Sequence, residues 1–330
     1  MAPPSILSLF RWAGALPVDL SPANITRGTI GIARLRSIPG HLETWLKSEE
    51  WSDFPPIAVF GATGRLGGAL RAVWPKHWPV TWVGRRAVPG APLTICDPLR
   101  DVERLAEIAG SAEVILSLLG PAPGGTLKQD GDLADHARLA LALCDAATGP
   151  VLLASSAAVY GSLGESGKLL HESTPVPKDL PPYGAAKYAM ETATDARVLR
   201  IGNVAGFDAI LGAWTPEFTL DTFPDGSTPR RSYIGPCTLA LTLAALCKKS
   251  SLLPKTLNVA EPGAIEMSAL LEAAGRPFAA RVAKADAIAH VELDTSALIQ
   301  LVPQLAEPGD PARMVREVRW IDHTGSKTNR

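Results

Sequence analysis

Residues 57–74 read IAVFGATGRLGGALRAVW, and they decide the fold of this 330-residue chain. A short apolar run ends in a glycine-rich turn of the form G-x-x-G-x-x-G, and a helical segment follows. Glycine lets a strand turn sharply into a helix, and it lets a phosphate approach the backbone where a Cβ would collide. The free N–H groups of the helix N-terminus then favour a bound phosphate. We expect a dinucleotide diphosphate to be bound at Gly61, Thr63, Gly64, Arg65, Leu66 and Gly67.

The chain up to residue 206 alternates short apolar runs with helical segments. We expect strands at 57–61, 79–84, 91–96, 112–120, 150–156 and 196–203, and helices at 65–74, 99–110, 132–147 and 185–194. Such alternation predicts crossover units and a parallel sheet. The strands read as continuous apolar runs because a parallel sheet is covered on both faces. The fold class is therefore α/β, with a doubly wound parallel sheet of the Rossmann type.

The pattern also predicts a division into domains. After residue 206 it loosens and becomes richer in proline, which indicates a smaller substrate lobe. A helix at 238–247 and a strand at 256–260 return to the main sheet. We expect an N-terminal extension at 1–54 with a short amphipathic helix in it, a dinucleotide-binding domain at 55–206 plus 233–262, a substrate lobe at 207–232 plus 263–322, and a tail at 323–330.

Composition excludes several classes of protein. Lys and Arg number 32 against 33 Asp and Glu, so no basic field attracts nucleic acid or an anionic membrane. No segment approaches the roughly 20 apolar residues of a membrane span. The 4 cysteines form no C-x-x-C pair and the 6 histidines have no metal-binding spacing, so we expect no metal site. Together with Arg11, which interrupts the apolar N-terminus, these features favour a cytoplasmic protein.

The residues after the second strand indicate which dinucleotide binds. A site for NAD(H) uses an Asp or Glu about 20 residues beyond the loop, but residues 61–96 contain no acidic residue. Instead the strand is followed by Arg85 and Arg86, and Arg65 lies in the loop. Because guanidinium groups match a phosphate, we expect NADP(H) to be preferred over NAD(H). Two residues at strand ends are expected to meet the cofactor: Asp97, at the adenine edge, and Gly120, where the backbone approaches it.

A second motif indicates the chemistry. Tyr183 and Lys187 stand four residues apart in a helical segment, so they share one face. A phenol has a pKa of about 10, and a nearby ammonium favours the phenolate. Tyr183 could then exchange a proton with a carbonyl or hydroxyl oxygen, while Lys187 holds the nicotinamide ribose. Ser156, at the end of the fifth strand, could stabilise charge on the reacting oxygen.

These motifs and three more occur in one order along the chain: GATGRLGG at 61–68, SSAAVYG at 155–161, YGAAK at 183–187, LRIGNVAG at 199–206 and LNVAEPG at 257–263. In this the chain resembles the extended short-chain dehydrogenase/reductases, the superfamily of NAD(P)-dependent sugar epimerases, dehydratases and reductases. The resemblance covers about residues 56–320. It implies catalytic roles for Ser156, Tyr183 and Lys187.

The resemblance further implies that Tyr160 lines the substrate side of the site. Arg200, Asn203 and Gly206 match the R-x-x-N-x-x-G element of the superfamily, which lies beside the nicotinamide and opens the substrate lobe. Asn203 is therefore a candidate substrate-binding residue. The superfamily also often pairs through the two helices here at 132–147 and 185–194, which implies a homodimer.

The chain departs from the superfamily pattern in three respects. The segment 230–240, RRSYIGPCTLA, lacks the usual acidic pair. About 55 residues precede the glycine-loop strand. The lobe is small and the link from the second to the third strand is short, which is loosely similar to the dTDP-dehydrorhamnose reductase branch.

These observations lead to one functional hypothesis and two alternatives. The hypothesis is an NADP(H)-dependent oxidoreductase that transfers a hydride to or from a ketone or secondary alcohol of a small, sugar-like or nucleotide-sugar substrate. A nucleotide-sugar epimerase that retains its NAD(P) is the first alternative. A non-catalytic NADP(H)-binding sensor or assembly protein is the second, and the intact set of Ser156, Tyr183 and Lys187 argues against it.

Overall fold

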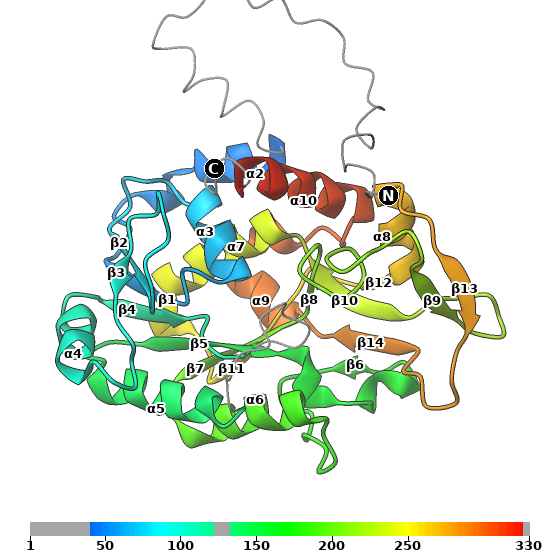
Figure 1. Ribbon diagram of the computed structural model, residues 1–330, viewed down its shortest axis with the longest axis horizontal. Helices are drawn as coiled ribbons and strands as arrows, with labels where there is room; N and C mark the ends of the chain where they lie inside the picture. The colour runs from blue at the N-terminus through cyan, green and yellow to red at the C-terminus, as the bar shows by residue number, and fades with distance from the viewer. Residues whose placement is uncertain (1–39, 122–132, 326–330) are drawn as a thin grey trace, which may run out of the picture. The chain divides into compact units, whose positions relative to one another are not determined.

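The computed structural model describes residues 40–121 and 133–325 (Figure 1). Most of the expected N-terminal extension, residues 1–39, lies outside the described residues, as do residues 326–330 of the expected tail. Within the described ranges, no helix is long and apolar enough to cross a membrane.

The main sheet contains seven strands, all paired in parallel. They are β1 (Ile57–Phe60), β2 (Val80–Gly84), β3 (Thr94–Ile95), β4 (Val114–Ser117), β5 (Val151–Ser156), β7 (Arg197–Ile201) and β11 (Thr256–Val259). Their order, β11-β7-β5-β4-β1-β2-β3, confirms the doubly wound fold predicted from the sequence. The strand expected at 91–96 is shorter than predicted, because Pro92 cannot donate a ladder hydrogen bond.

Helices cover both faces of this sheet (Figure 1). On one face lie α3 (Arg65–Val73) and α7 (Pro236–Lys248), and on the other α4 (Val102–Gly110), α5 (Asp135–Ala146) and α6 (Pro182–Ala193). Neighbouring residues of β1 point to opposite faces, so Val59 packs in one apolar cluster and Phe60 in another. Helix α7 is apolar on almost every side, as expected of a helix whose residues 236–247 are all buried. Together with β11, it confirms that this segment returns to the main sheet.

A second, mixed sheet lies beyond the carboxyl ends of the main one. It contains β6 (Leu169–Leu170), β8 (Asn203–Val204), β10 (Arg230–Ile234), β12 (Ala264–Glu266) and β14 (His290–Leu293). A two-stranded ribbon of β9 (Thr219–Thr222) and β13 (Ala279–Val282) accompanies it, with α8 (Met267–Ala274) and α9 (Ser296–Leu301). Short 3-10 helices connect these elements at Ala157–Tyr160, Leu163–Ser166, Ser250–Leu252 and Pro303–Leu305. The second sheet takes β6 and β8 from the segment that the sequence assigned to the dinucleotide-binding domain.

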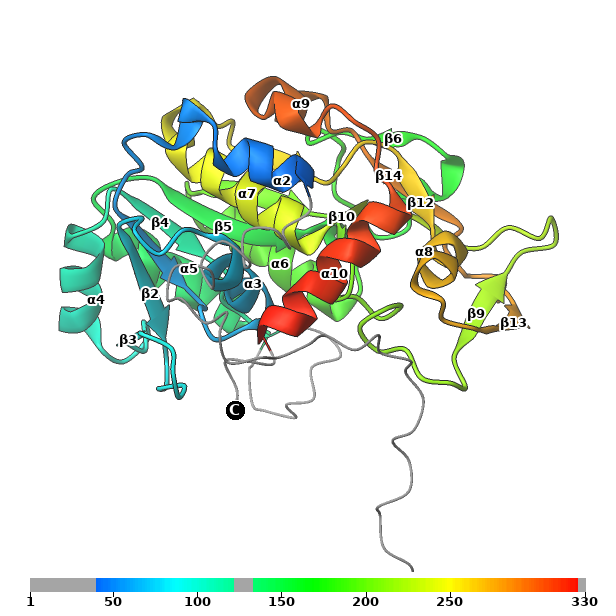
Figure 2. The same ribbon diagram turned by 90° about the horizontal axis from the view of Figure 1, so that it is seen from above.

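Aromatic side chains attach the segment before β1 to the body. The amphipathic helix expected there is α2 (Gly40–Leu46), followed by a 3-10 turn at Glu49–Trp51, and it lies over α7 (Figure 2). The ring of Trp51 lies 5.0 Å from that of Trp78, and Phe54 stacks on Trp78 at 3.9 Å. Since each such aromatic pair contributes about 1 kcal/mol beyond its buried area, this cluster fixes residues 51–54.

The last helix, α10 (Pro311–Gly325), supplies a carboxylate where the superfamily's acidic pair is missing. Glu317 is fully buried and accepts hydrogen bonds from the backbone N–H groups of Cys237 and Thr238 at 2.9 and 3.0 Å, and from Thr238 Oγ1 at 2.7 Å. Gly235 makes this approach possible, because a Cβ there would lie 2.6 Å from Glu317 Cδ. The orphan donors at the start of α7 are thus satisfied by a residue 80 positions away. Helix α10 also includes residues 323–325, which the sequence assigned to the tail.

Replacing Glu317 should weaken the whole fold. Glu317→Ala leaves two buried backbone donors without an acceptor, so we expect the free energy of unfolding to fall by about 2–4 kcal/mol. Urea unfolding followed by tryptophan fluorescence measures this change. Arg316→Ala, at an exposed position of the same helix, is the matched control and should change stability by less than about 0.5 kcal/mol. Equal stability of the two variants would contradict the capping role.

Candidate active site

The glycine loop forms a backbone cradle at the end of β1. Gly61 has a φ of +90°, and helix α3 begins at Arg65 with no side chain capping its N-terminus and no acidic residue in its first turn. A Cβ on Gly67 would lie 2.6 Å from Ala62 Cα, so only glycine lets α3 approach the turn this closely. Free N–H groups and a positive helix end therefore face a space that suits a diphosphate. This cradle fits the cofactor that the sequence predicts.

The cradle lies where the strand order reverses. Strand β1 pairs with β2 on one side and with β4 on the other, and chain connections leave in opposite directions from this point. The ends of β1 and β4 are in close contact, since a Cβ on Gly61 would lie 3.0 Å from the carbonyl carbon of Leu118. In open α/β sheets, ligands bind outside the carboxyl ends of the strands at such a reversal.

The residues expected to bind the cofactor lie in different surroundings. Arg85 and Arg86 are exposed and directly follow β2. Arg65 turns instead toward the second lobe, where its Nη1 donates to the carbonyl oxygen of Phe207 at 2.7 Å. Asp97 is half-buried, and its Oδ1 accepts a hydrogen bond from the N–H of Leu99 at 3.1 Å. Thr63 and Gly64 are exposed in the cradle, whereas Leu66 packs against the apolar core.

Ser156, Tyr183 and Lys187 come together at the carboxyl end of β5. The hydroxyl of Ser156 accepts from the N–H of Ala158 at 3.2 Å, and it is near enough to Tyr183, in the first turn of α6, to oppose the rise in the pKa of that phenol. Lys187 lies one turn further along this helix, with its Nζ 5.9 Å from the centre of the Tyr183 ring. The three side chains that the sequence selected therefore share one site.

Burial controls the ionisation of this group. Lys187 is only 5% exposed, and its Nζ donates to the carbonyl oxygen of Ala154 at 2.7 Å. Desolvation lowers the pKa of Lys187 to about 8, although the charge of Glu191 opposes this. Desolvation also raises the pKa of Tyr183, with partial opposition from Ser156. The pKa of Tyr183 therefore moves in the direction opposite to the one expected from the sequence, because the phenol loses solvent.

A buried ion pair that the sequence analysis missed supports the catalytic helix. Glu191, one turn after Lys187, binds Arg200 of β7 at 2.7 Å and accepts from Ser155 Oγ at 2.5 Å. The Arg200 guanidinium also lies over the ring of Tyr160, 4.9 Å from its centre. These contacts tie α6 to β5 and β7. A Lys-x-x-x-Glu spacing was the available sequence signal, but it does not reveal the partner on another element.

The structure corrects the role of Tyr160. This side chain is fully buried, and its hydroxyl donates to Asn258 Oδ1 at 2.8 Å, so it cannot line the substrate side in this conformation. It joins the segment after β5 to β11. Asn203, the other candidate substrate residue, is half-buried in β8, where it pairs with Tyr233 of β10. Tyr233 is fully buried and in turn donates to Asp208 Oδ2 at 2.8 Å.

His136, in the first turn of α5, is a further residue of the site that sequence reasoning missed. Its side chain is buried, its Nε2 lies 3.1 Å from the carbonyl oxygen of Pro121, and its ring meets Tyr183 edge-on at 5.9 Å. Gly120 has a φ of +120°, and a Cβ there would lie less than 3.0 Å from the imidazole. The glycine at the end of β4 therefore makes room for His136, which is not the reason expected from the sequence.

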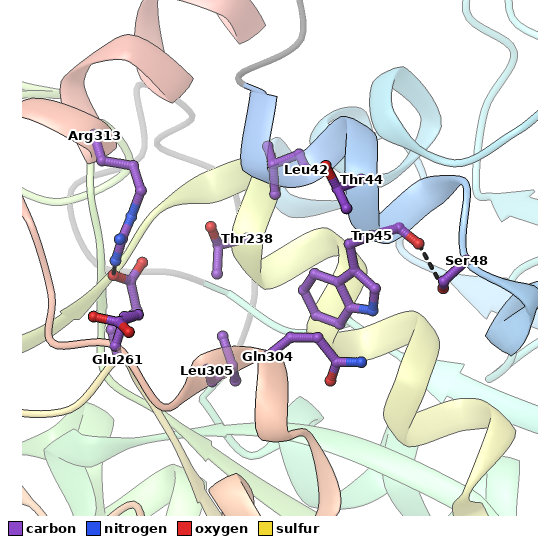
Figure 3. Close-up of a pocket in the computed structure, with 10 residues that line it drawn as sticks. Leu42, Thr44, Trp45, Ser48, Thr238, Glu261, Gln304, Leu305 and Arg313 are labelled. Carbon is purple, nitrogen blue, oxygen red and sulfur yellow. Dashed lines mark hydrogen bonds and ion pairs between the residues drawn. The ribbon is translucent and has the colours of Figure 1, made fainter.

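A cavity of about 380 Å³ opens elsewhere, between α2, α7 and the last helix (Figure 3). Trp45 and Leu42 of α2 form one wall, and Arg313 paired with Glu261 forms another. None of the ten residues that line it is among the candidate site residues. The cavity is thus separate from the Ser156–Tyr183–Lys187 group.

Comparisons with known proteins agree with this geometry. No protein with a curated description matches the chain in sequence. Among solved structures, it is similar to a short-chain dehydrogenase/reductase superfamily protein of Agrobacterium tumefaciens with bound NAD (TM-score 0.62, 16% identity, covering 81% of this chain and 97% of that one). It is also similar to UDP-N-acetylglucosamine 4-epimerase from Bacillus cereus (0.61, 18%, 80% and 98%) and to RMD from Pseudomonas aeruginosa complexed with NADPH (0.60, 16%, 82% and 99%). The model of the NAD dependent epimerase/dehydratase family matches residues 57–206 of this chain, the segment that contains the glycine loop, Ser156, Tyr183 and Lys187.

Proposed function

We propose that the protein is an NADP(H)-dependent oxidoreductase that acts on a ketone or secondary alcohol of a sugar-like or nucleotide-sugar substrate, with Tyr183 as acid and base. The observation that carries this proposal is the grouping of Ser156, Tyr183 and Lys187 at the carboxyl end of β5, with the Nζ of Lys187 5.9 Å from the centre of the Tyr183 ring. The substrate would lie between this group and the second lobe.

Each of the site residues would have a separate role in such a reaction. When bound, the nicotinamide ring donates or accepts the hydride. In the reducing direction, the Tyr183 hydroxyl gives its proton to the carbonyl oxygen as that oxygen gains charge, and a solvent proton later restores the phenol. Ser156 Oγ donates a hydrogen bond to the same oxygen and stabilises the developing charge. Lys187 supplies a fixed positive charge and two further N–H donors for the ribose, since one is used on Ala154.

The preference for the phosphorylated cofactor rests on charge at the end of β2. Arg85 and Arg86 are both exposed there, and the strand end offers no carboxylate to bind a ribose 2′-hydroxyl. A 2′-phosphate would gain charge-assisted hydrogen bonds from these side chains. Arg65 joins them only if the bond to Phe207 opens.

An epimerase that keeps its cofactor is the second candidate, and the similar structures named as nucleotide-sugar 4-epimerases favour it. Such an enzyme returns the hydride to the same substrate and needs no external dinucleotide. The absorbance and mass of small molecules released from the denatured, purified protein separate the two cases. A stoichiometric bound dinucleotide without net NADPH consumption would favour the epimerase.

Removing the Tyr183 hydroxyl should separate chemistry from cofactor binding. In Tyr183→Phe we expect kcat to fall at least about 100-fold, because no group replaces the proton donor. The Kd for NADPH should change less than about threefold, since the lost interaction acts in the transition state. Steady-state kinetics and fluorescence titration measure the two quantities. Tyr188→Phe, at an exposed position of the same helix, is the control, and a fully active Tyr183→Phe enzyme would overturn the assignment.

Replacing both arginines after β2 should change the choice of cofactor. In Arg85→Ser/Arg86→Ser we expect NADPH to bind about 10–100-fold more weakly, because charged hydrogen bonds to the 2′-phosphate are lost. Binding of NADH, which lacks that phosphate, should change less than about threefold. Calorimetric titration with both dinucleotides measures the ratio. Arg104→Ser, at an exposed position that pairs with Glu107, is the control, and an equal loss for both dinucleotides would refute the phosphate contact.

Burial of the charged Lys187 side chain should lower the free energy of unfolding near neutral pH. Its pKa is about 8 in the folded protein and 10.5 ordinarily, so both states are protonated below pH 8 and the whole penalty then opposes folding. The penalty diminishes as the pH rises from 8 toward 10.5. We expect Lys187→Met to raise the free energy of unfolding by roughly 2 kcal/mol at about pH 7 and by less at about pH 9.5. Urea unfolding at both pH values tests this, and a variant less stable than the wild type at neutral pH would contradict it.

A further inference from the structure

We propose that His136 is a positioning residue for Tyr183, because its imidazole is wedged between Gly120 and the phenol and holds that phenol against Ser156. The proposal rests on the proposed function, in which Tyr183 transfers the proton. It adds the first turn of α5 and the end of β4 to the elements that set the catalytic geometry.

The imidazole is fixed to the backbone at the end of β4. Its Nε2 lies 3.1 Å from the carbonyl oxygen of Pro121, and since a carbonyl only accepts, Nε2 carries the hydrogen. The side chain is 1% exposed, and its buried Nδ1 has no hydrogen-bond partner among the residues that the structure describes. An unpaired buried acceptor costs about 1–3 kcal/mol, which an apolar ring in the same place would avoid. The bond to Pro121 is what the imidazole gains over such a ring.

The other side of the imidazole contacts the catalytic phenol. The two rings meet at 72° with centres 5.9 Å apart, in the edge-to-face arrangement that aromatic rings favour. The ring of Tyr183 thus lies against His136, and Ser156 is near enough to the phenol to oppose the rise in its pKa. Burial, and next the charge of Lys187, lower the pKa of His136 to about 4. The ring is therefore neutral at physiological pH and adds no second positive charge beside Lys187.

Gly120 and His136 are coupled by steric contact. A Cβ at position 120 would lie less than 3.0 Å from both Nδ1 and Cε1 of the imidazole, so any side chain there must displace the ring. A displaced ring loses its contact with Tyr183 and its bond to Pro121. Substitutions at Gly120 and at His136 should therefore act through the same event.

This coupling gives a sharp test by double-mutant cycle. We expect Gly120→Ala and His136→Ala each to lower kcat about 10-fold while the Kd for NADPH changes less than about threefold. The double variant should be no worse than His136→Ala alone, because the new methyl group then meets no ring. His136→Phe, which keeps a ring but not the bond to Pro121, should give an intermediate kcat. The proposal would be overturned if the kcat loss of the double variant equalled the product of the two single losses. A kcat within twofold of wild type in His136→Ala would also overturn it.

A spectroscopic measurement on Tyr183 tests the same proposal without depending on turnover. The chain has 4 tyrosines, so ¹³Cζ-tyrosine labelling gives a simple NMR spectrum in which Tyr183→Phe identifies one signal. Gly120→Ala and His136→Ala should shift that signal and leave the exposed Tyr188 unchanged, whereas His77→Ala, at an exposed histidine, should shift neither. An unmoved Tyr183 signal would overturn the proposal. A wild-type protein without oxidoreductase turnover would instead overturn the proposed function. The spectrum would still show whether the His136 imidazole positions the Tyr183 phenol.

Discussion

The close approach of α3 to the end of β1 is the constraint on which the rest of the molecule depends. Gly67 lies against the backbone of Ala62, and the turn between them leaves the first N–H groups of the helix uncovered. This turn lies where the strand order reverses, because β1 pairs with β2 on one side and with β4 on the other, and the carboxyl ends of the central strands lie at the same edge. Ser156 and the catalytic helix reach this edge from β5. The glycine loop and the Ser156–Tyr183–Lys187 group thus meet at one edge of the sheet, as the proposed function requires.

Sequence patterns predicted those features of the molecule that neighbouring residues determine. Apolar runs bounded by glycine predicted the main strands. The four-residue spacing of Tyr183 and Lys187 predicted that both side chains lie on one face of a helix. Ser156 was found because it ends a strand. In each case, the residues that decide the structure are close in sequence or bear a fixed relation to an element boundary.

The features that the sequence did not reveal depend on contacts between distant segments. A single histidine in an apolar helix carries no spacing signal, so His136 became visible only with Gly120 and Tyr183 around it. The burial of Tyr160 depends on Asn258, almost a hundred residues away. Arg65 was expected on a phosphate, but its long side chain reaches the carbonyl of Phe207. Glu317 replaces an acidic pair absent from the helix it caps, and no pattern within either helix links the two.

The aromatic cluster around Trp78 has a consequence for how the enzyme can be handled. Trp51 and Phe54 precede the first strand, yet they cover one side of the Trp74–Trp78 surface. A shortened protein that starts at the dinucleotide-binding domain would leave indole rings open to water, and a patch of that kind promotes self-association. Expression of the protein for crystallisation or engineering therefore has to retain the stretch from α2 onward, although the family match begins only at residue 57.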